Sequence, residues 1–163
     1  MTGSTGPVDV TLDIPMEPQP KARPRARVLP SGVATIYTPA STRKWEATVA
    51  SLAAMQLPGT IIEGPVRVDV LAVMSRPKRL LRRNDPDGLV WAPTRPDGDN
   101  IRKAVLDALA PFWRDDAQVV AGDTLKVYAE KTGRPRTVIR IRSLHGVGLL
   151  AGGPESCAVS LGL

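Results

Sequence analysis

The chain has 163 residues, a formal net charge of +6 and a pI near 10.0. That length suits one domain with a buried core, and the positive balance favours an anionic partner such as nucleic acid. One Cys and one His exclude a disulfide framework, a cysteine zinc site and most histidine-based chemistry, which leaves Asp, Glu, Lys, Arg and hydroxyl groups for catalysis.

No apolar run approaches the roughly 20 residues of a membrane span. The first residues, MTGSTGPVDV, lack the basic and apolar regions of a signal peptide. We therefore expect no membrane association and a cytoplasmic location in a bacterial or phage-infected cell.

The amino-terminal part predicts a strand at residues 8–14, where apolar and polar residues alternate. A proline-rich basic segment follows, with cations at alternate positions that an extended chain places on one side. We interpret these cations as a phosphate-contacting arm, against the alternative of a solvated basic loop: Lys21, Arg23, Arg25 and Arg27.

A short strand at 33–37 is expected to form a hairpin with 25–28 across Pro30-Ser31-Gly32. Thr38 as N-cap and Pro39 at the first helical position predict a helix that runs to about Gln56. Its apolar stripe of Trp45, Val49, Leu52 and Met55 or Gln56 is interpreted as core.

Residues 65–74 predict a second strand, with Val66, Val68 and Val70 facing one way and Arg67 and Asp69 the other. A long loop follows, and long loops in compact domains are often functional. Its cations are predicted to contact DNA, the alternative being a mobile solvated loop: Arg76, Lys78, Arg79, Arg82 and Arg83.

A helix is predicted between Gly98 and Leu109, with an apolar stripe of Ile101, Val105, Ala108 and Leu109. A strand with a bulge near Gly122 is expected over 117–131, and another over 137–141. The order strand-helix-strand-helix-strand-strand predicts an α+β fold with a small mixed sheet of about four strands packed by two helices. We expect one domain over residues 1–143 and a Gly-rich tail over 144–163.

Carboxylates gather around the second predicted helix. Asp97 and Asp99 flank its start, Lys103 follows Asp99 by one turn, and Asp115-Asp116 comes after its end. Oxygen ligands of this kind suit Mg²⁺ or Mn²⁺, and a lysine suits a scissile phosphate. Each residue alone has a structural alternative, as a helix cap, a turn or an ion pair. For Asp107, beside Lys103, a surface ion pair is the favoured interpretation.

The string RPDGDNIRKAVLDAL followed by FWRDDAQVV resembles the RusA-type Holliday junction resolvases. The shared pattern is Asp-x-Asp-Asn, a Lys four residues after the second Asp, Asp-Ala-Leu, and Asp-Asp before a strand. PKARPRARV, IYTP and the segment 42–46 also resemble the amino-terminal half of family members. The resemblance covers residues 14 to 131.

The resemblance implies a homodimeric metal-dependent endonuclease that takes a four-way DNA junction and cleaves two opposed strands with Mg²⁺ or Mn²⁺. By motif position, Asp97, Asp99 and Asp116 correspond to the catalytic, metal-binding carboxylates and Lys103 to the catalytic lysine. Asn100 and Asp115 are supporting neighbours. The longer basic segment before Asp97, Ala22 in place of a common Gly, and the tail after Ser143 depart from the family.

Three functions follow as hypotheses. The first is a structure-selective endodeoxyribonuclease that resolves Holliday junctions in recombination and repair and is related to phage or prophage. The alternative from another class is a non-catalytic module that binds branched DNA. The third keeps the nuclease but changes its substrate to flaps, forks or plain duplex, and the sequence does not separate it from the first.

Overall fold

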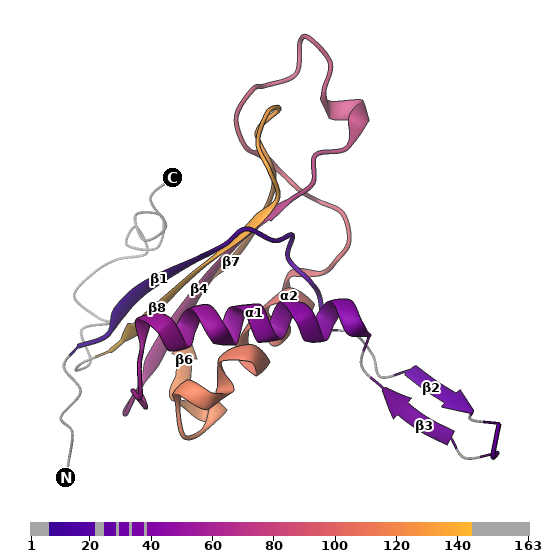
Figure 1. Ribbon diagram of the computed structural model, residues 1–163. Helices are drawn as coiled ribbons and strands as arrows, with labels where there is room; N and C mark the ends of the chain where they lie inside the picture. Colours follow the sequence, from indigo (N-terminus) through magenta and orange to yellow (C-terminus); the bar gives the residue numbers. More distant parts are fainter. Residues whose placement is uncertain (1–6, 22–24, 29, 33, 38, 145–163) are drawn as a thin grey trace.

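A computed structural model describes residues 7–21, 25–28, 30–32, 34–37 and 39–144. Two helices, α1 (Ala40–Gln56) and α2 (Gly98–Leu109), lie on one face of a six-stranded sheet (Figure 1). The expected α+β class and both helices are confirmed. No helix in the described part of the chain is long and apolar enough to cross a bilayer.

The sheet is mixed. Its strand order is β1 (Asp9–Ile14), β8 (Arg136–Ser143), β4 (Val66–Met74), β7 (Thr124–Tyr128) and β5 (Val90–Trp91), and β6 (Val119–Ala121) also pairs with β4. β4 runs antiparallel to β8 and parallel to β6 and β7. The sheet exceeds the predicted four strands because the long loop contributes β5 and the region 117–131 divides into β6 and β7 at Gly122.

The basic arm forms a hairpin of its own. β2 (Arg25–Val28) pairs antiparallel with β3 (Ala34–Tyr37), in the register Arg25↔Tyr37 to Val28↔Ala34. This confirms the predicted hairpin, which extends away from the sheet beyond the start of α1 (Figure 1). Pro39, rather than Thr38, occupies the N-cap position of α1, and Thr38 lies outside the described residues.

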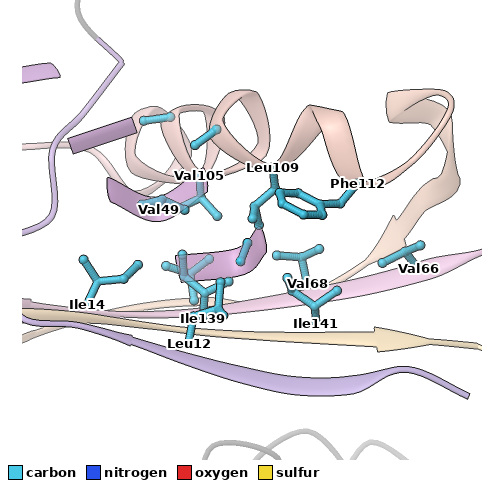
Figure 2. Close-up of a cluster of buried hydrophobic side chains, with 14 of the residues drawn as sticks. Leu12, Ile14, Val49, Val66, Val68, Val105, Leu109, Phe112, Ile139 and Ile141 are labelled. Carbon is cyan, nitrogen blue, oxygen red and sulfur yellow. The ribbon is translucent and has the colours of Figure 1, made fainter. Parts of the chain in front are cut away.

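The core lies between the helices and the sheet (Figure 2). In α2 the predicted stripe is confirmed, since Ile101, Val105 and Leu109 are fully buried. In α1 the stripe follows an i, i+4 row through Trp45, Val49 and Ala53 instead of turning toward Met55. The interpretation of Met55 as core is wrong, because its side chain is 78% exposed.

Val66, Val68 and Val70 point into this core, as their alternation predicts. On the other face of β4, Asp69 is fully buried and accepts hydrogen bonds from Arg67 Nε (2.9 Å) and Arg142 Nη2 (3.0 Å). Burial alone raises the pKa of Asp69, but hydrogen bonds from Arg67, the Asp123 amide and Arg142 outweigh it and hold the pKa below its usual value. Asp69 is therefore an ionised anchor for β7, which begins next to Asp123.

Arg102 fixes α2 onto the sheet. Its Nη1 donates to the Val68 carbonyl (2.9 Å) and its Nη2 to the Ala121 carbonyl (3.3 Å), so one guanidinium joins α2, β4 and β6. Gly122, with φ +141, lies against the same Val68 carbonyl, where any Cβ would overlap it. The close approach and the positive φ together explain why β6 and β7 divide at a glycine.

Gly122→Ala is expected to lower the free energy of unfolding by about 2 kcal/mol, because the new Cβ strains the backbone and displaces the Val68 carbonyl from Arg102. Urea unfolding monitored by circular dichroism measures this. Gly88→Ala is the matched control, since Gly88 has open space around it and no positive φ. Equal stability of the two variants would contradict the steric argument.

Candidate functional site: the acidic start of α2

Asp97 and Asp99 flank the first residue of α2. Asp97 is the N-cap residue, with extended φ −71 and ψ 142, but its side chain makes no capping hydrogen bond. Asp99 is in the first turn, and both side chains are exposed. The described part of the chain provides no hydrogen bond or ion pair to either carboxylate. The exposed backbone N–H groups of the helix start offset part of their mutual repulsion.

Lys103 lies one helical turn beyond Asp99 and is exposed, with no ion pair in the described part of the chain. Its charge is therefore available to a phosphate close to the carboxylate pair. Asn100 is half-buried, and its carbonyl accepts a hydrogen bond from the Lys21 amide (2.8 Å). This bond brings the base of the basic arm to the first turn of α2.

Because Lys21 lies beside α2, it and not Lys103 is the ion-pair partner of Asp107. Lys21 Nζ forms ion pairs with Asp107 (2.5 Å) and with Glu46 of α1 (3.3 Å). Hydrogen bonds to Asp107 and then Glu46 raise the pKa of Lys21 despite partial burial. The ion-pair interpretation of Asp107 is confirmed, but the expected partner Lys103 is wrong, because Lys21, at the base of the arm, lies beside α2. Lys21 joins the arm to both helices.

Sequence reasoning missed Lys126 of β7. Its side chain runs past the start of α2, with Cδ 3.6 Å from where a Cβ of Gly98 would lie, and its Nζ donates to the Thr94 carbonyl (2.6 Å). A second lysine therefore stands beside the segment that carries Asp97. Alternation in TLKVY indicates that Thr124, Lys126 and Tyr128 share a face, but only the tertiary fold shows that α2 begins there.

Asp115 and Asp116 have different roles. Asp115 is the N-cap of a 3₁₀ turn, η3 (Asp116–Gln118): it accepts from the Ala117 amide (2.7 Å) and forms a capping box with Gln118. Asp116 is exposed, and its Oδ1 accepts a hydrogen bond from the indole Nε1 of Trp113 (3.0 Å). This agrees with treating Asp115 as a structural neighbour and leaves Asp116 available to a ligand.

Within one chain, Asp116 lies far from Asp97 and Asp99. α2 begins beside Thr124 and Lys126, which pair with Val70 and Ala72 of β4. Beyond its end, Trp113 bridges to Ile62, which precedes β4. β7 lies beside the start of α2, but the twelve residues of α2, about 18 Å long, separate the two acidic positions. Accordingly, no group of three His, Cys, Asp or Glu side chains among the described residues is placed to hold a metal.

The donor set at the start of α2 nevertheless fits a hard divalent cation. Mg²⁺ commonly binds proteins through one or two carboxylates, and water and substrate phosphate complete its octahedral shell. Asp97 and Asp99 supply two carboxylates that no described side chain engages. The assignment of Asp116 to the same metal stays a prediction.

Comparison with protein families identifies the chain. The family model described as "Endodeoxyribonuclease RusA" matches residues 15–142. The chain belongs to the RusA endodeoxyribonuclease family. A protein of Bacillus subtilis (strain 168), described as "Uncharacterized protein YqaN", is 34% identical over 134 residues, covering 78% of this chain and 92% of the relative.

Membership in the RusA family gives the chain the activity class of an endodeoxyribonuclease and supports DNA binding and a role as a Holliday junction resolvase in recombination. The matched region contains every residue of the acidic site. It also contains the basic arm and the long basic loop, so the cations of both belong to the family domain.

In this RusA-family chain, Arg76 holds the basic loop together. Its guanidinium donates to the carbonyls of Leu80 (2.9 Å), Pro86 (2.7 Å) and Gly88 (3.0 Å), and more weakly to that of Ala129 (3.4 Å). The prediction that Arg76 contacts DNA is not tested, but its donors are already engaged. The structure therefore gives Arg76 a scaffolding role.

The remaining loop cations are exposed and form no ion pair in the described part of the chain: Lys78, Arg79, Arg82 and Arg83. They lie in and after a short 3₁₀ helix, η1 (Lys78–Leu80). Of the arm cations, Arg23 lies outside the described residues, as do the side chains of Arg25 and Arg27. The predicted DNA contacts of the loop and the arm stay predictions.

Arg76→Gln is expected to loosen the loop, because the carbonyls of Leu80, Pro86 and Gly88 lose their shared donor. Limited trypsin digestion followed by mass spectrometry measures this as faster cleavage after residues 78–83. Arg95→Gln is the matched control, since its exposed side chain forms no ion pair in the described structure and Arg95 lies outside the measured cleavage sites. Equal digestion rates for the two variants would remove the scaffolding role.

Proposed function

We propose that this RusA-family endodeoxyribonuclease resolves Holliday junctions by metal-dependent hydrolysis of two opposed phosphodiester bonds. The observation that carries the proposal is the start of α2, where two carboxylates lie close to Lys103, one helical turn beyond Asp99. None of the three side chains has a hydrogen bond or ion pair within the described part of the chain. A purely DNA-binding module gains nothing from exposed carboxylates beside a polyanion. The proposed setting is recombination and repair in the cytoplasm of a bacterial or phage-infected cell, with a link to phage or prophage.

Asp97 and Asp99 would hold Mg²⁺, with Mn²⁺ as a plausible substitute. When bound, such an ion polarises the phosphoryl oxygen and activates a water molecule for attack. Lys103, one helical turn from Asp99, would contact a non-bridging phosphate oxygen and offset the charge that develops on it. Hydrolysis joins the water oxygen to phosphorus and breaks one ester bond to the neighbouring sugar.

The protein surface around this site has two electrostatic parts. The exposed carboxylates of Asp97 and Asp99 stand at the start of α2, and exposed cations occupy the loop at residues 78–83. Such cations bind phosphates without reading bases, which suits recognition by shape rather than by sequence. The proposed partner is therefore branched DNA.

We further infer a homodimer that completes the site. Asp116 is exposed but lies at the far end of α2 from Asp97 and Asp99, so one chain does not bring the three together. A two-fold dimer can place Asp116 of each copy beside the carboxylate pair of the other, and it presents two sites to two opposed strands. The motif position of Asp116 supports its role as a ligand, and its second oxygen has no partner among the described residues.

Asp97→Asn is expected to bind a synthetic four-way junction normally and to cut it at least about 100-fold more slowly, because a metal ligand is lost while the basic surface is kept. The measurement is cleavage in Mg²⁺ and in Mn²⁺, with linear duplex, flap and fork alongside. Asp107→Asn on the same helix is the control, since Asp107 is engaged by Lys21.

Paired cuts on the junction by the wild type, lost in Asp97→Asn, establish the activity. Undiminished cutting by Asp97→Asn would remove the proposed site. Binding without cutting by the wild type, in either metal, would favour the branched-DNA-binding module. Equal cutting of every branched substrate would keep the site and change the substrate.

Mixing two inactive variants tests the shared site. Asp97→Asn and Asp116→Asn homodimers each lose both sites, but a mixed dimer regains one site that is intact in all three carboxylates. Subunit exchange is therefore expected to restore single-strand nicking of the junction without paired cleavage. If all three carboxylates act within one chain, both sites of the mixed dimer are defective and no activity returns.

A further inference from the structure

Trp113 is buried but donates to an exposed carboxylate. Only 4% of the residue is accessible, and its backbone bridges to Ile62 beside the Ile62 amide–Phe112 carbonyl hydrogen bond (2.8 Å). From this fixed position its indole Nε1 donates to Oδ1 of Asp116 (3.0 Å). The indole occupies one carboxylate oxygen and leaves the other without a described partner.

Burial of an indole does not by itself require such a partner in this fold. Trp45 of α1 is fully buried, and its Nε1 has no hydrogen-bond partner among the residues that the structure describes. The hydrogen bond from Trp113 is therefore not needed to bury the indole, and its consequence is to restrain the Asp116 carboxylate.

The backbone that carries Asp116 is held independently of the indole. Gln118 Nε2 donates to the carbonyls of Ile62 (3.0 Å) and Gly64 (2.8 Å), and Gln118 Oε1 accepts from the Arg114 amide (2.8 Å). Asp115 caps the same turn. Loss of the indole N–H thus removes a restraint on the Asp116 side chain while the turn itself remains fixed.

We propose that Trp113 is a positioning residue that fixes the carboxylate of Asp116 in the orientation that binds the divalent metal. This inference rests on the proposed function, in which Asp116 is a metal ligand. An exposed Asp side chain samples several rotamers, and one hydrogen bond from a rigid buried donor selects among them. Hydrogen-bond partners of metal ligands typically contribute 10- to 100-fold to metal affinity or activity.

The test is Mn²⁺ binding to the protein without DNA, measured by electron paramagnetic resonance, for wild type and Trp113→Phe. Phe keeps most of the aromatic packing and lacks the N–H group. Trp113→Phe is expected to weaken Mn²⁺ binding about 10-fold. Trp45→Phe is the matched control, because it makes the same change at a buried indole without a partner, and its affinity is expected to stay within about two-fold of wild type.

Equal Mn²⁺ affinity of Trp113→Phe and wild type, or equal weakening by Trp113→Phe and Trp45→Phe, would overturn the inference. Asp116→Asn separates this from the proposed function. If Asp116→Asn weakens Mn²⁺ binding while Trp113→Phe does not, the metal role of Asp116 stands and only the role of Trp113 fails. If Asp116→Asn binds Mn²⁺ as wild type does, both fail.

A measurement on the wild type covers the case in which Trp113→Phe does not fold. The three Trp indole groups of the chain give separate ¹H–¹⁵N resonances. Addition of Mg²⁺ is expected to shift the Trp113 indole resonance, because the Trp113 N–H donates to Asp116, the proposed metal ligand. The Trp45 resonance is expected to stay in place, because its N–H has no partner among the described residues. An unmoved Trp113 resonance at saturating Mg²⁺ would overturn the inference.

Discussion

The guanidinium of Arg102 is the contact on which the arrangement of the site depends. Within the described part of the chain it bonds α2 to the backbone of both β4 and β6, and Gly122 leaves the space in which it does so. Burial lowers the pKa of Arg102, and the charges of Asp69 and Asp123 oppose that effect. Because Asp97, Asp99 and Lys103 all belong to α2, their position relative to β7 and Lys126 follows from this contact.

α2 also explains why Asp97 and Asp99 lie at one end of the helix and Asp116 lies beyond the other. Its start carries two carboxylates that form no hydrogen bond or ion pair within the described part of the chain. Beyond its end, a turn carries Asp116, which accepts a hydrogen bond from the buried Trp113. A rigid helix between them keeps both positions fixed but apart. In the proposed dimer, Asp116 of one copy lies beside Asp97 and Asp99 of the other. Dimer assembly and metal binding then depend on each other, because the metal contacts both copies.

Features that depend on local pattern could be predicted from the sequence. The alternation of Val66, Val68 and Val70 gave the buried face of β4, and the stripe from Ile101 to Leu109 gave that of α2. The turn at 30–32 gave the hairpin. The motif around Asp97 and Asp99 led to the family, which the comparison confirmed.

Features that depend on tertiary contacts could not be predicted in this way. Nothing local shows that Lys21 reaches Asp107, that Lys126 lies beside Gly98, or that the Arg76 guanidinium is directed inward. These contacts also separate the cations into two groups. Lys21 and Arg76 are engaged within the fold, whereas the exposed cations at residues 78–83 remain available to a ligand.

The way in which Arg76 holds its loop has an evolutionary consequence. The Arg76 guanidinium donates to main-chain carbonyls, which every residue type possesses. These hydrogen bonds therefore do not depend on which side chains the loop carries. Residues 78–83 are therefore free to diverge while the loop keeps its path. In the proposed function, in which these residues contact DNA, exchanging side chains there would change the DNA contact without altering the fold or the position of α2.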